Sequence, residues 1–178
     1  MDDFSIKSVS IASGAKEIGF ASYKNCRSLT SVTIPSSVTK IGTEAFSGCT
    51  SLKSIVIPSS VTEIGERAFM NCTGLKSITL PSAAVIKKLA FGGCIGLPSV
   101  TIPSLKVKVH TQAFNGCTSL ASIVFPEPLK WHPDREFYSG VSQTNPYSLI
   151  YWVQKATAGN TPADIAEYFI TAAVGYRL

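Results

Sequence analysis

The chain has 178 residues, of which 45% are hydrophobic and 15% charged, so it is too apolar for a disordered protein and long enough to bury one core. No apolar run approaches the ~20 residues of a transmembrane helix, so we expect no membrane span. The net charge of +5 comes from 16 Lys and Arg scattered along the chain, with no cluster longer than Lys87-Lys88, and therefore predicts no nucleic-acid partner.

The N-terminal stretch MDDFSIKSVS has two acids and no apolar run after a basic start, so we expect no secretory signal in this sequence. This favours a cytoplasmic location; a cell-surface or secreted protein would carry its signal outside this chain. The strand of an incomplete first repeat falls at Val9 to Ile11. Eight residues are too few to form another coil before it, so we expect its open edge to extend into a longer array or to pack against another chain in a homo-oligomer.

A repeat of 22 or 23 residues dominates the chain from this point on. Each copy carries a cysteine at the same offset: Cys26, Cys49, Cys72, Cys94 and Cys117. An aromatic residue lies three positions before each cysteine: Tyr23, Phe46, Phe69, Phe91 and Phe114. A Leu follows each cysteine by three residues, and a Val or Ile follows it by six. An apolar residue and a proline close each segment: Ile34-Pro35, Ile57-Pro58, Leu80-Pro81, Ile102-Pro103 and Phe125-Pro126. So many shared offsets predict a repeat architecture.

The spacing L-x-x-[VI]-x-[ILF] predicts a short strand in every copy, with alternate residues facing inward. Proline ends the strand because it has no N–H to donate, and the Ser-Ser or Ser-Ala that follows begins a turn. Residues such as Val38 and Ile41 should then point inward again, and the Ala-Phe pair should bring the chain back onto the core. A coil of this length has no room for a long convex helix, so we expect a short extended piece and a tight helical turn.

The segment LKSIVIPSSVTEIGERAFMNC, like its counterparts in residues 4–126, resembles the BspA-type leucine-rich repeats. The resemblance implies an α/β fold, a right-handed solenoid with a parallel in-register sheet and short convex turns, over residues 1–140. This domain would contain a partial first coil, five cysteine-containing copies and a decayed last coil. Members of this family, found in bacterial and protist surface proteins, are generally adhesion or protein-interaction modules without catalytic residues.

The five cysteines share one place in the repeat, which predicts a column of small buried residues with one thiol in each coil. None belongs to a C-x-x-C pair, so we expect no metal site. Neighbouring coils would be ~4.8 Å apart, which does not exclude disulfides, although the odd number leaves at least one thiol free. We expect the thiols to be reduced and buried.

Outward-facing strand positions form a sheet of Ser, Thr and Val beside a partial row of lysines, without aromatic anchors. Such a face is either a solvated sheet of β-forming residues or a low-relief platform for a protein or an extended peptide. The candidate partner-binding residues are Lys7, Ser31, Thr33, Lys53, Ser54, Val56, Lys76, Ser77, Thr79, Ser99 and Thr101.

The chain offers little material for catalysis. His110 occupies a coil-turn position held by glycine in other copies, and we expect it to be exposed. The segment KWHPDREFY, residues 130–138, gathers polar and aromatic side chains: Trp131, His132, Asp134, Arg135 and Glu136. A loop of the decayed coil accounts for it, and an enzyme that uses this loop is a remote alternative. No phosphate-binding loop, zinc spacing or nucleophile elbow occurs, so we predict no enzyme and no cofactor.

Residues 141–178 differ in character from the repeats. Asn145-Pro146 and Thr161-Pro162 each place an N-cap candidate before a proline at the first helical position. We expect two helices that form a C-terminal cap over the last coil; a helical docking motif is the alternative. For the whole chain we favour a non-catalytic protein-binding or scaffolding module, with a cell-surface adhesin segment as the alternative function.

Overall fold

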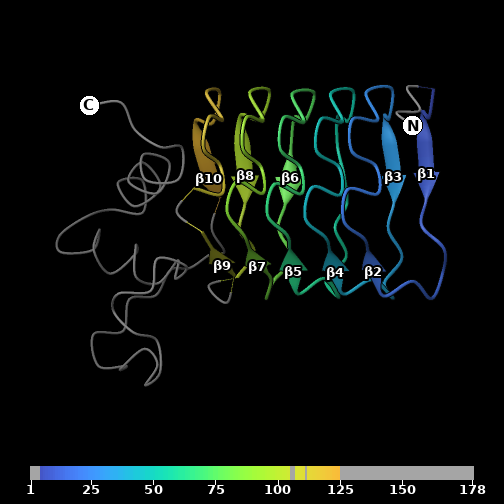
Figure 1. The fold of residues 1–178 in the computed structure, drawn as a ribbon. Helices are drawn as coiled ribbons and strands as arrows, with labels where there is room; N and C mark the ends of the chain where they lie inside the picture. The colour runs from blue at the N-terminus through green and yellow to red at the C-terminus, as the bar shows by residue number, and fades with distance from the viewer. Residues whose placement is uncertain (1–4, 105–106, 111, 125–178) are drawn as a thin grey trace, which may run out of the picture.

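The computed structural model describes residues 5–104, 107–110 and 112–124, which wind into a three-sided solenoid of short parallel strands (Figure 1). Each coil runs along a front side, a back side and a turn side before it stacks on its neighbour. A parallel-strand solenoid of leucine-rich-repeat type is therefore confirmed. The expected helical cap, the domain boundary at residue 140 and the loop at 130–138 lie outside the described residues.

The front side contains the strands that follow each leucine. It is built from β1 (Ser8–Ser10), β3 (Ser31–Thr33), β6 (Ile78–Thr79), β8 (Ser99–Thr101) and β10 (Ser122–Val124), with residues 54–57 as its third coil. The front strands pair in parallel, and the pairing brings equivalent residues into line, as in Ser8 with Ser31 and Ser99 with Ser122. A single bridge between Ser54 and Ser77 joins the third coil to the fourth.

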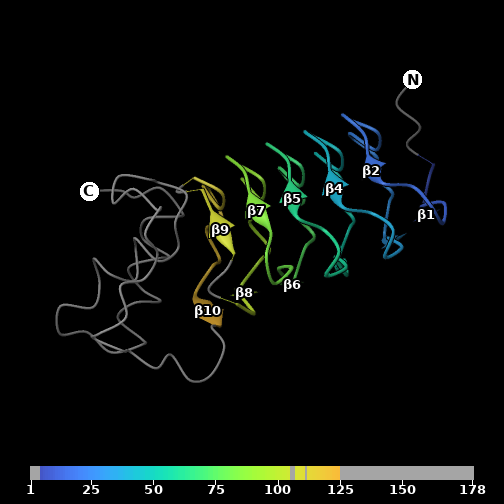
Figure 2. The same ribbon diagram turned by 90° about the horizontal axis from the view of Figure 1, so that it is seen from below.

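The back side is a parallel sheet of five two-residue strands, one from each coil. These are β2 (Glu17–Ile18), β4 (Lys40–Ile41), β5 (Glu63–Ile64), β7 (Val85–Ile86) and β9 (Lys108–Val109), paired in chain order (Figure 2). The second residue of each pair is buried, because successive side chains of a strand point to opposite faces. This sheet is the short extended piece that the repeat length predicts.

The turn side consists of residues 20–25, 43–48, 66–71, 88–93 and 112–116. Along it, successive backbone N–H groups donate in turn to a carbonyl of the next coil and to a carbonyl of the same coil. The Phe46 N–H donates to the Ala68 carbonyl of the next coil at 2.7 Å, whereas the Ser47 N–H donates to the Glu44 carbonyl at 3.1 Å. These alternating hydrogen bonds give the backbone N–H groups of the turn side acceptors without a regular helix or strand, so a tight turn can close each coil.

The core runs through the solenoid as columns of identical side chains. Leu52, Leu75 and Leu97 have no exposed surface, and neither do Phe46 and Phe69. Aromatic rings of consecutive coils are stacked from Tyr23 to Phe114, with centroids 5.2 to 5.3 Å apart. The predicted aromatic column is therefore part of the core.

All five cysteines are thiols that lie buried beside the aromatic column, as predicted. Each thiol from the second described coil onward donates to the backbone carbonyl of the aromatic residue in the preceding coil. The Cys72 Sγ lies 3.2 Å from the Phe46 carbonyl oxygen, and the Cys94 Sγ lies 3.2 Å from that of Phe69. Cysteine suits this position because it fills a small apolar space and still supplies a weak donor.

Candidate functional site

The front side presents the predicted partner-binding residues outward. Nine of the eleven candidates are exposed in the structure, and Ser99 and Thr101 are partly buried. Among the described residues, Val56 is the most exposed large hydrophobic side chain, at 82%. Strand register places a row of serines beside a row of Thr and Val, as shown by the pairing of Ser99 with Ser122 and of Thr101 with Val124.

Lys7, Lys53 and Lys76 lie at the N-terminal end of the front strands, and we call them the lysine edge. Backbone hydrogen bonds align their shared repeat position: the Lys76 N–H donates to the Lys53 carbonyl at 2.9 Å, and the Thr30 N–H donates to the Lys7 carbonyl at 2.8 Å. All three lysines are exposed, and none forms an ion pair with another described residue. The structure thus brings the sequence-predicted lysines into one column of the repeat.

The front side presents polar, cationic and aliphatic groups to a partner. Its outward groups are hydroxyls, ammonium groups and the aliphatic side chains of Val56 and Val124. The Phe column belongs to the turn side, and among the described residues no aromatic side chain lies on the front strands. A partner there would meet hydrogen-bonding groups and positive charge on a regular lattice of strands.

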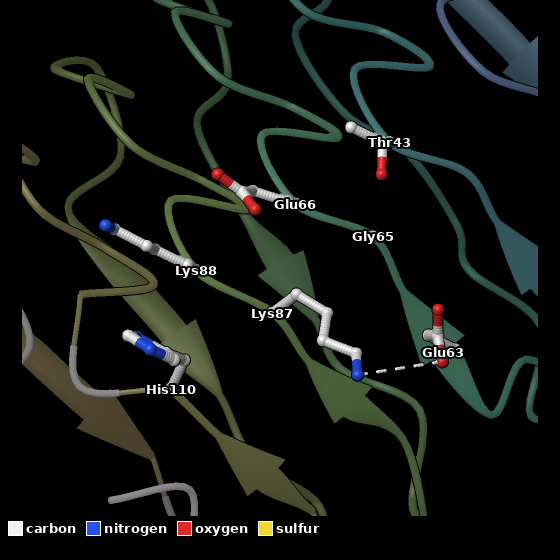
Figure 3. A pocket seen from close by; sticks show the side chains of 7 residues that line it. All are labelled: Thr43, Glu63, Gly65, Glu66, Lys87, Lys88 and His110. Carbon is white, nitrogen blue, oxygen red and sulfur yellow. Dashed lines mark ion pairs between the residues drawn. The ribbon is translucent and has the colours of Figure 1, made fainter.

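A charged depression of about 300 Å³ lies at the corner between the back and turn sides, and sequence reasoning missed it (Figure 3). Its lining residues are Thr43, Glu63, Gly65, Glu66, Lys87, Lys88 and His110. Gly42 and Gly65 share a repeat position with Lys87 and His110. A Cβ on Gly65 would lie 2.7 Å from the backbone carbon of Gly42, so these coils stack closely only without side chains at this position.

Ion pairs occupy much of this region. Glu63 lies between Lys40, at 3.8 Å, and Lys87, at 3.9 Å, and Lys40 also lies 3.5 Å from Glu17. Glu66 pairs with Arg67 at 3.3 Å. The acidic and basic groups therefore compensate one another across successive coils of the back side.

His110 lies in this depression and is partly buried, so it is less exposed than the sequence predicts. Burial lowers the pKa of His110, and the positive charge of Lys88 lowers it further. The Nδ1 atom of His110 accepts the backbone N–H of Gln112 at 3.1 Å. A neutral imidazole held in this way lines the wall of the depression. The sequence does contain a signal for this site, because the repeat position held by Gly42 and Gly65 is occupied by the large side chains of Lys87 and His110 in the next two copies.

Two features of the described residues bear on metal binding and on reactivity: their metal-ligating side chains and their buried thiols. No group of three His, Cys, Asp or Glu side chains within this part of the chain could hold a metal ion. Burial raises the pKa of Cys49 from 9.0 to about 12 and also raises the pKa of Cys72, so these thiols stay protonated and weakly nucleophilic. In the same residues, no helix is long and apolar enough to cross a bilayer.

The chain matches the family described as "BspA type Leucine rich repeat region (6 copies)" over residues 1–104 and 82–147. Among solved structures it is similar to a leucine-rich cell surface protein of Faecalibacterium prausnitzii, at 35% identity and a TM-score of 0.65, over 70% of this chain and 33% of that one. A leucine-rich repeat protein of Bacteroides ovatus is 37% identical, with a TM-score of 0.59, over 66% of this chain and 31% of that one.

A leucine-rich repeat protein of T. pallidum is 29% identical, with a TM-score of 0.59, over 68% of this chain and 57% of that one. The chain therefore spans about a third of the length of the first two structures. A comparison with curated proteins gave no match.

Proposed function

Because the chain belongs to the BspA-type leucine-rich repeat family, we propose that it is a non-catalytic module that binds a protein or an extended peptide through its front side. The observation that carries this proposal is the alignment of exposed candidate residues along one side of the solenoid. Solenoids use extended surfaces of stacked repeats in this way, because each added coil enlarges the same surface.

The back and turn sides are less suited to this role. Back-side charges are largely paired within the chain. A partner that bound there would either break the ion pairs of Lys40 and Glu63 or bury them, which costs desolvation energy without adding a new ion pair. The turn side uses its backbone N–H groups to join neighbouring coils. Front-side hydroxyls and lysines can instead contact a partner without breaking an ion pair, because none of these lysines forms one with another described residue.

The test is capture of proteins from a lysate of the source cells on the immobilised chain, followed by binding measurements with the purified captured protein. Val56→Glu places a negative charge in the middle of the front side, and Gln112→Glu adds the same charge to an exposed position of the turn side. Both positions are exposed, so neither change should affect folding. We expect Val56→Glu to abolish binding and Gln112→Glu to leave it unchanged; the opposite pattern would contradict the proposal.

A cell-surface adhesin segment is the second candidate function. It is supported by the similarity to the F. prausnitzii protein, whose description places that protein at the cell surface. The two candidates differ in location, since a scaffold of the cytoplasm is protected by the cell envelope and an adhesin is not. Protease treatment of intact source cells should leave the chain intact if it is cytoplasmic, and should remove it if it is an adhesin.

A further inference from the structure

We propose that the lysine edge selects an acidic, extended polypeptide segment that lies across the coils of the front side. This inference rests on the proposed function and names the chemistry of its partner. Its basis is the way charge is divided among the three sides of the solenoid.

Acidic side chains of the described residues all lie away from the front side. Glu17 and Glu63 belong to the back strands, and Glu44 and Glu66 belong to the turn side. Each of them has a basic partner within the chain: Glu17–Lys40, Glu44–Lys24, Glu63–Lys40 and Lys87, and Glu66–Arg67. Lys7, Lys53 and Lys76 have no carboxylate beside them among the described residues, so the front side carries positive charge that a partner can compensate.

The spacing of these lysines fits a chain that runs along the solenoid axis. Lys53 and Lys76 lie on adjacent coils, and Lys7 lies two coils before Lys53, with Thr30 between them. Neighbouring coils are ~4.8 Å apart and an extended chain advances ~3.3 Å per residue, so two coils span about three residues of such a segment. Because alternate residues of an extended segment face the same way, carboxylates two residues apart are separated by ~6.6 Å. This distance lies between the one-coil spacing of Lys53 and Lys76 and the two-coil spacing of Lys7 and Lys53, and flexible lysine side chains can reach it.

Side chains of the front side supply the other contacts that a polypeptide needs. The hydroxyls of Ser54 and Ser77 lie beside the lysines, where they can hydrogen-bond to peptide groups of the segment. Val56 offers an exposed apolar contact in the next row. Recognition would rest on these side chains, since the backbone groups of β1 and β3 pair with each other, as do those of β6, β8 and β10.

An acidic polypeptide fits this surface better than single-stranded nucleic acid, which is also negatively charged. Proteins that bind single strands combine positive charge with aromatic side chains on which the bases stack. Phe46, Phe69 and Phe91 are buried on the turn side, and no described aromatic residue lies on the front strands. The front side therefore supplies the charge without the stacking surface.

The experiment measures fluorescence anisotropy of a labelled, glutamate-rich peptide with the full chain, at low and at physiological ionic strength. The matched probe has glutamine at every glutamate position. One variant carries Lys7→Gln, Lys53→Gln and Lys76→Gln, and the control carries Lys16→Gln, Lys88→Gln and Lys108→Gln. Both variants lose the same net charge at exposed positions, so the control removes any effect of overall charge.

We expect the acidic peptide to bind, the glutamine peptide not to bind, and added salt to weaken the complex. The front variant should bind about tenfold more weakly, the loss expected from three exposed ion pairs, and the control variant should bind as the native chain does. An equal loss in both variants, equal binding of the two peptides, or tighter binding of a single-stranded oligonucleotide to the lysine edge would overturn the proposal.

The same front variant separates this inference from the proposed function. If Val56→Glu abolishes binding of the captured protein and the lysine variant still binds it, the front side is the binding surface but the proposal of an acidic segment is wrong. If neither change affects binding, both proposals are wrong.

Discussion

The rings of Phe69 and Phe91 lie parallel, with their centroids 5.2 Å apart and their planes inclined by only 1°. This pair spans the one shorter repeat of the array, since Cys72 and Cys94 are 22 residues apart. Strand pairs are 23 apart at Ser54 and Ser77 but 22 apart at Glu63 and Val85, so the missing residue comes from the corner between β6 and β7. The corner absorbs the deletion, and the aromatic column keeps its register.

Emptying one position of this column should strongly destabilise the solenoid. We predict that Phe69→Ala lowers the free energy of unfolding by about 3–5 kcal/mol, because the ring is fully buried between two others. Urea unfolding followed by circular dichroism measures the loss, and Val56→Ala, at an exposed position, is the control. A loss below about 1 kcal/mol at Phe69 would mean that the column contributes little to the core.

The buried thiols should react slowly in the folded protein. Burial raises the pKa of Cys49 from 9.0 to about 12, so the thiolate that attacks alkylating reagents is scarce at neutral pH. We predict slow alkylation of Cys49 and Cys72 in native protein and rapid alkylation of all five cysteines after unfolding. Mass spectrometry that finds two stoichiometric disulfides would contradict this and would indicate an oxidising compartment.

The same pKa predicts how stability changes with pH. Above pH 9 the unfolded chain loses the Cys49 proton while the folded chain keeps it, so the free energy of unfolding falls as pH rises from about 9 toward about 12. We expect the urea midpoint to decrease between pH 8.5 and pH 10.5. Cys49→Ala should show a shallower decrease, and an identical slope in both proteins would show that this thiol is not buried as the structure indicates.

Two glycines on the turn side provide a matched pair of substitutions. Gly48 and Gly116 have nearly the same positive φ, 76° and 78°, but a Cβ on Gly48 would overlap the Asn25 side-chain oxygen, while one on Gly116 would make only ordinary contacts with Gly93. We predict that Gly116→Ala costs about 1 kcal/mol from its backbone conformation alone. Gly48→Ala should cost more because Asn25 must also move; equal losses would show that this amide moves without cost.

Sequence reasoning succeeds here wherever a property depends on position within the repeat. Strands, the aromatic column and the buried cysteines follow from offsets that every copy shares, because stacking places equivalent residues in contact. The depression around His110 depends instead on departures from the repeat, where Lys87 and His110 replace glycine and Glu63 reaches lysines in two different coils. Such contacts depend on where side chains extend between coils, which a strand pattern does not specify.

The most direct test of front-side binding is acetylation footprinting of the lysines in the complex with the captured protein. The acetylation rate of each described lysine measures how accessible its side of the solenoid is, and mass spectrometry determines the rate for each lysine separately. We predict that binding lowers the reactivity of Lys53 and Lys76 and leaves Lys16 and Lys108 unchanged. Protection of Lys16 and Lys108, with Lys53 and Lys76 as reactive as in the isolated chain, would show that the partner binds the back side and would contradict the proposed role of the front side.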